Sequence, residues 1–140
     1  MNSEIALRIS RSFLEAHVRC AEERWGGSLQ SKAELVPAIV CIAFSIEIGL
    51  KAILNAEGKR VSGHNFQPLF DSISEECRTL IVRNTGYEST RFHSELTDAS
   101  NAFVEWRYIY ESNQDKSASV QFLMLFAHAI HKVADECGDA

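Results

Sequence analysis

Glu47 and Lys51 are the only charged residues in an otherwise apolar segment, residues 43–54. At 100° per residue, Glu47 lies on the same side of a helix as Phe44 and Leu54, so the pattern predicts that its carboxylate points inward. A buried carboxylate without a partner is unfavourable or takes up a proton. Lys51, one helical turn later, is one candidate partner.

A second candidate partner for Glu47 comes from a later segment, residues 103–111, where Arg107 lies at the edge of an apolar seam. We predict a polar cluster of Glu47, Lys51 and Arg107 between two helices, with Glu111 as a candidate fourth member. Two interpretations are open for such a cluster. It fixes the register of the two helices, or it lines a cleft for RNA or another ligand.

Three segments together resemble the HEPN superfamily of prokaryotic helical-bundle domains: IAFSIEIGLKAIL (42–54), GKRVSGHNFQPLFDSI (58–73) and FVEWRYIYE (103–111). The family pattern is an acid followed by leucine and lysine on the second helix, a Gly-His-Asn turn and an arginine on a late helix. The resemblance implies that Glu47, Lys51, His64, Asn65 and Arg107 lie near one site.

Many members of the superfamily are metal-independent ribonucleases or toxin components of toxin–antitoxin and defence systems, and they are usually dimeric. Others are non-catalytic modules that bind RNA or a partner protein. The resemblance therefore implies a homodimer, with RNA and a cognate antitoxin or other protein as candidate partners.

Catalytic members of the superfamily carry an arginine and, after four to six intervening residues, a histidine. After Arg107 these positions hold Ser112, Asn113 and Gln114, none of which titrates near neutral pH. Loss of a general acid/base costs a factor of about 10²–10⁴ in rate, so we expect a non-catalytic or weakly catalytic module. The alternatives are a ribonuclease that combines Arg107 with His64 or His93, and a structural interaction domain.

Two other groups of histidines carry less weight. Arg11 and His17 match the catalytic spacing, but six residues rotate a helix by about 240°, so we expect them on different sides and reject the pair. His128, His131 and Asp135 share one side of a helix at metal-ligand spacing, and we interpret that side as solvated. We therefore predict no metal and no cofactor.

Composition is that of a soluble, single-domain protein spanning residues 1–140. The net charge of −5 disfavours a broad nucleic-acid surface but leaves room for a small basic cleft. The four cysteines have no CxxC spacing, which favours free thiols in a reducing compartment. The longest uncharged run, residues 35–46, is too short to span a bilayer, so we expect a cytoplasmic protein without a membrane segment.

Helical periodicity predicts an all-α bundle of about five helices. The expected ranges are 3–24, 34–58, 66–82, a long seam over 92–110, and 118–137. Asn65 is the expected N-cap of the third helix.

The first helix is expected to bury one apolar stripe and to expose charged residues spaced one turn apart. The seam of the fourth helix and the nearly uncharged second helix suggest a dimer interface, although a five-helix core could absorb both. The stripe of the first helix consists of Ile5, Ile9, Phe13, Ala16 and Cys20.

Overall fold

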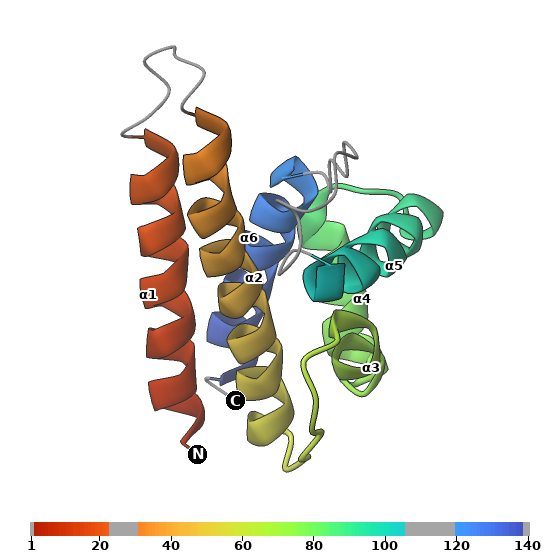
Figure 1. The fold of residues 1–140 in the computed structure, drawn as a ribbon. Helices are drawn as coiled ribbons and strands as arrows, with labels where there is room; N and C mark the ends of the chain where they lie inside the picture. The colour runs from red at the N-terminus through yellow and green to blue at the C-terminus, as the bar shows by residue number, and fades with distance from the viewer. Residues whose placement is uncertain (1, 23–30, 106–119, 139–140) are drawn as a thin grey trace.

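The protein is an all-α bundle, as its periodicity predicts. The computed structural model describes residues 2–22, 31–105 and 120–138, and these form helices without a strand. Figure 1 shows the chain order. The helices are α1 (Ser3–Glu22), α2 (Ser31–Ala56), α3 (Phe66–Asp71), α4 (Glu75–Thr85), α5 (Ser89–Glu105) and α6 (Val120–Gly138).

The end of α2 follows from one glycine. Gly58 has a φ of 75°, a left-handed conformation that costs glycine little. This conformation lets the N–H of Lys59 donate to the carbonyl of Leu54 at 2.9 Å, and the N–H of Gly58 donates to that of Asn55 at 3.0 Å. The pair of hydrogen bonds is a Schellman motif, which closes the helix at the predicted place.

The predicted helix over 66–82 is wrong, because the chain forms two helices there. Asn65 caps α3 as expected, accepting the N–H of Gln67 at 3.0 Å. After a short break, Ser74 starts α4 by accepting the N–H of Cys77, and two acidic residues occupy the first turn. A serine cap followed by acids is favourable at a helix N-terminus, and it outweighs the continuous apolar pattern.

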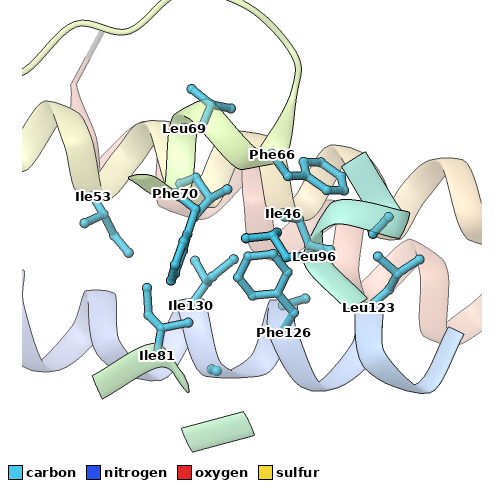
Figure 2. Close-up of a cluster of buried hydrophobic side chains, with 14 of the residues drawn as sticks. Ile46, Ile53, Phe66, Leu69, Phe70, Ile81, Leu96, Leu123, Phe126 and Ile130 are labelled. Carbon is cyan, nitrogen blue, oxygen red and sulfur yellow. The ribbon is translucent and has the colours of Figure 1, made fainter. Parts of the chain in front are cut away.

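The core lies where α2, α3, α5 and α6 converge, with α4 closing it from the side of α6 (Figure 1). Phe126 of α6 is fully buried, and its ring lies 5.4 Å from that of Phe92 and 6.1 Å from that of Phe70. Figure 2 shows Phe126 and Phe70 among Ile46, Ile53 and Ile130. Aromatic rings at these separations pack edge-to-face or tilted and join the helices into one core.

The long seam predicted over 92–110 begins inside this core. Phe92, Leu96 and Ala99 of α5 are buried against the other helices. This part of the seam therefore offers no surface to a second chain. Trp106 and Tyr110, at its far end, lie outside the described residues.

The inward face of α1 differs from the prediction. Ile5 and Ile9 are exposed, so the predicted stripe flanks the buried face of the helix instead of forming it. The buried face combines small or polar residues with one leucine, and α1 approaches α2 closely there, next to Ser45 and Gly49. Its members are Ala6, Ser10, Leu14 and His17.

One helix in the described part of the chain, Pro37–Ala56 of α2, is long and apolar enough to cross a membrane. Its mean hydropathy is 1.9, and 67% of the segment is buried inside the bundle. Burial of this extent fits the central core helix of a soluble protein.

Candidate functional site

Glu47 and Lys51 lie one turn apart on α2, at the rim of the core. Only 7% of the Glu47 side chain is exposed, and its Oε2 accepts a hydrogen bond from Nζ of Lys51 at 3.2 Å. The Lys51 side chain reaches solvent at 24% exposure. The acid that stands out in the sequence is therefore buried and paired, and its partner is partly hydrated.

The loop between α2 and α3 returns His64 to this acid. Nδ1 of His64 lies 3.0 Å from Oε1 and 3.1 Å from Oε2 of Glu47. Because an ionised carboxylate only accepts hydrogen bonds, Nδ1 carries the proton and donates it. The His64 side chain is 72% exposed, and Gly63 allows the turn with a φ of 108°. Glu47 thus orients an imidazole at the surface.

The remaining residues of the predicted cluster are Asn65, Arg107 and Glu111. The side chain of Asn65 caps α3 and is exposed, so it supports the turn that carries His64. Arg107 and Glu111 lie outside the described residues. Glu47, Lys51 and His64 are the members that the structure brings together.

His93 lies in a different environment from His64. Its ring contacts those of Phe92 at 5.6 Å and Phe70 at 6.1 Å. It lines a shallow cavity of about 390 Å³ together with Arg78 and Arg83. His93 therefore lies against two aromatic rings, at a cavity that Arg78, Arg83 and Glu75 also line, and takes no part in the contact between Glu47 and His64.

A small cationic hollow adjoins the Glu47 cluster. Lys51, Lys59 and Arg60 line a cavity of about 330 Å³ at the end of α2. Lys59 is held by Oε1 of Glu57 at 3.3 Å and by the carbonyl of Ser72 at 3.0 Å. The loop that carries His64 therefore also brings three cations together, two of which, Lys51 and Lys59, are paired with Glu47 and Glu57.

A second polar cluster, which the sequence did not predict, joins α1, α2 and α6. Oγ of Ser10 lies 2.5 Å from the carbonyl oxygen of Ser45 and 2.6 Å from Nε2 of His131. Oγ of Ser45 donates in return to the carbonyl of Ser10 at 2.8 Å. The arrangement is satisfied when Ser10 donates to the carbonyl and His131 donates from Nε2 to Ser10.

Ser10 and His131 have the spacing of a nucleophile and its base, but their burial excludes that role. Ser10 is fully buried and His131 is 7% exposed, so a substrate has no access to the hydroxyl. The acid one turn after His131, Asp135, pairs with Arg11 at the surface. This cluster therefore fixes the positions of three helices.

His131 corrects the prediction of a solvated face on α6. His128 and Asp135 are exposed, but His131 points inward to Ser10. Burial, followed by the charges of Arg11 and His128, lowers the pKa of His131 to about 4, against a smaller opposing effect of Asp135. His131 is therefore neutral at pH 7. Within the described residues, no three His, Cys, Asp or Glu side chains lie close enough together to hold a metal ion.

Arg11 and His17 also diverge, as their spacing predicts. Arg11 reaches Asp135 at the surface, whereas His17 is buried and its Nδ1 lies 2.7 Å from the carbonyl of Ala38. These side chains share no contact that could support proton transfer beside a bound phosphate.

The sequence contained one signal for the buried cluster. Gly49 interrupts an apolar helix, and an added Cβ there would lie 2.8 Å from Cγ2 of Ile130 and 3.0 Å from Oγ of Ser10. A glycine inside a core helix often marks a close approach of two elements. No sequence pattern identified the helices that meet there.

No protein-family model matches the chain significantly, and neither does any curated protein or solved structure. The geometry of the two clusters is therefore the basis for assigning a function.

Replacing Lys51 with methionine is expected to lower the free energy of unfolding by about 1 kcal/mol, because among the described side chains the buried Glu47 carboxylate then keeps only the N–H of His64 as a hydrogen-bond donor. Urea denaturation at neutral pH measures the loss. The double variant Glu47→Met/Lys51→Met should recover most of it, since no buried charge is left. A double variant less stable than the single one would contradict this account.

Proposed function

We propose that this chain is a HEPN-like module, non-catalytic or weakly catalytic, that binds RNA or a protein partner in a toxin–antitoxin or defence system of the prokaryotic cytoplasm. The observation that carries the proposal is the contact between Nδ1 of His64 and the carboxylate of Glu47. It joins the Gly-His-Asn turn to the acid of α2, so two of the three segments that resemble the superfamily meet at one site.

RNA is the partner that the charges around this site favour. Lys51, Lys59 and Arg60 line the hollow beside the loop of His64, and phosphate binding depends on such concentrations of positive charge. The small extent of the hollow suits a few phosphates of a single strand. A net charge of −5 disfavours a long duplex.

The double variant Lys59→Gln/Arg60→Gln is expected to bind a single-stranded RNA roughly tenfold more weakly at low salt, because two phosphate contacts are lost. The slope of log affinity against log salt should fall by about 1.4 for the same reason. Fluorescence anisotropy with a labelled 20-mer measures both quantities, and circular dichroism confirms that the variant is folded.

Arg91→Gln/Lys132→Gln is the matched control, since it removes two exposed cations of other helices and changes the net charge equally. It should leave the affinity and the slope near the wild-type values. Equal losses of RNA affinity in both double variants would show that net charge alone causes the effect, and would refute a site at Lys59 and Arg60.

The orientation of His64 favours a second candidate, a metal-independent ribonuclease. The buried Glu47 accepts from Nδ1, which leaves Nε2 of an exposed imidazole as a proton acceptor. Arg107 is the cation that the resemblance assigns to the phosphate. RNA cleavage in EDTA, abolished by His64→Ala and by Arg107→Ala but not by His93→Ala, would establish this function in place of a binding module.

A further inference from the structure

The outer side of α1 carries an apolar surface that continues onto α2. Ile5 is 52% exposed and Ile9 is 40% exposed. Phe13 is partly buried and its ring lies 5.3 Å from that of Phe44, which is itself 36% exposed. Figure 1 places α1 at the edge of the bundle, on the side of α2 away from α3. Two adjacent helices thus expose one continuous apolar strip.

The strip has the form of a helix-packing seam. Its α1 members recur every three or four residues along a helix of 20 residues. This spacing keeps them on one narrow line, which suits lengthwise packing against another helix. The α1 members are Ile5, Ile9, Phe13, Ala16 and Cys20.

A row of four exposed charges flanks the seam on one side. Glu4, Arg8, Glu15 and Arg19 fall within about 60° of one another around the helix axis. Along the chain their signs read acid, base, acid, base, and Arg8 already pairs with Glu4 at 3.3 Å. When the helix is reversed, the order of signs is reversed as well.

Read in the opposite direction, the signs are base, acid, base, acid, so the row is complementary in charge to a second copy of α1 that runs the opposite way. In an antiparallel pair of helices the same flank of each helix meets the other. Glu4 then lies opposite the partner's Arg19, and Arg8 opposite the partner's Glu15. In a parallel pair this flank would face the opposite flank of the partner helix, so the four charges of one copy would not meet those of the other.

From these observations we infer that α1 is the interface of a homodimer, in which two copies of α1 pack antiparallel with the two-fold axis close to Ser12. A second copy of this chain is the occupant because the charge row and the seam are both self-complementary about that point, as an isologous interface requires. The inference goes beyond the proposed RNA binding, since it uses none of the residues near His64.

Cysteine cross-linking tests the surface and the direction together, in a background in which Cys20→Ser and Cys41→Ser remove the native thiols of this face. Ser12→Cys should give a disulfide-linked dimer under mild oxidation, because both copies of residue 12 lie at the axis. Glu4→Cys should stay monomeric on a denaturing gel, since the two copies of residue 4 are about 22 Å apart at 1.5 Å per residue. Ser94→Cys, exposed on α5, is the control for chance collision.

Two other cross-linking results would contradict the inference. Cross-linking of Glu4→Cys to the same extent as Ser12→Cys would contradict the antiparallel register. No cross-linking at Ser12→Cys, or an amount equal to that of Ser94→Cys, would show that α1 is not the interface.

Charge reversal gives an independent test that leaves the apolar seam intact. Arg8→Glu/Arg19→Glu makes the row entirely acidic, and Glu4→Arg/Glu15→Arg makes it entirely basic. Each variant alone should dimerise at least about tenfold more weakly in sedimentation velocity, and an equimolar mixture should recover the dimer. A mixture that stays monomeric while both chains are folded, or two variants that dimerise like wild type, would refute the proposed contact.

Discussion

Replacing Gly49 with alanine is expected to destabilise the protein by about 2–3 kcal/mol, in the upper part of the range for overpacked cores. The added Cβ would lie 2.8 Å from Cγ2 of Ile130 and 3.0 Å from Oγ of Ser10, and both neighbours are fully buried. Alanine normally stabilises a helix relative to glycine by about 1 kcal/mol, so the sign of the effect is itself diagnostic. Urea denaturation measures the change.

Ile130→Ala supplies the control for this steric account. Alone it leaves a cavity and is destabilising, but it also removes the Cγ2 atom that Gly49→Ala would meet. The double variant should therefore be more stable than the two separate losses predict. Strict additivity, or a stabilising Gly49→Ala, would show that the helices move apart at little cost.

Acidification is expected to remove about 2–3 kcal/mol of stability between pH 7.5 and pH 4.5 through His131 alone. The pKa of His131 is lowered from 6.5 to about 4 in the folded protein. The unfolded chain therefore takes up a proton as the pH falls through 6.5, and the folded chain takes it up only near pH 4. The contribution of His131 is complete above pH 6.5 and is lost as the pH falls from 6.5 to about 4.

His131→Gln tests this effect, because the amide of glutamine can still donate to Ser10 and does not titrate. The free energy of unfolding of this variant should fall less between the two pH values, by about 2–3 kcal/mol relative to wild type. His128→Gln, exposed on the same helix, should keep most of the wild-type pH dependence, because burial lowers the pKa of His131 more than His128 does. Equal pH dependence in wild type and His131→Gln would contradict the role of His131.

Local signals in the sequence predicted the helices and several of their ends. Gly58 and Asn65 act as expected, because a left-handed glycine and a capping side chain satisfy backbone groups only a few residues away. The serine and acids at residues 74–76 carried an equally local signal for a new helix, and the apolar pattern on either side concealed it.

The buried faces were harder to predict, because burial depends on which helix lies opposite. The seam of α1 is more apolar than the face that packs on α2, so hydrophobicity alone selected the wrong side. Ser10 and His131 are buried because each satisfies the other across 121 positions of the chain, and periodicity within one helix does not contain that pairing.

The sequence by itself predicted that the protein is all-α and that Glu47 is buried, with Lys51 as one of two candidate partners, since each follows from patterns within a few helical turns. The tertiary structure alone decided that His64 contacts Glu47, that Ser10 meets His131 and that Ile5 and Ile9 face solvent. These features depend on how whole helices and a returning loop pack against one another, and that packing is set by the shape of the complete core.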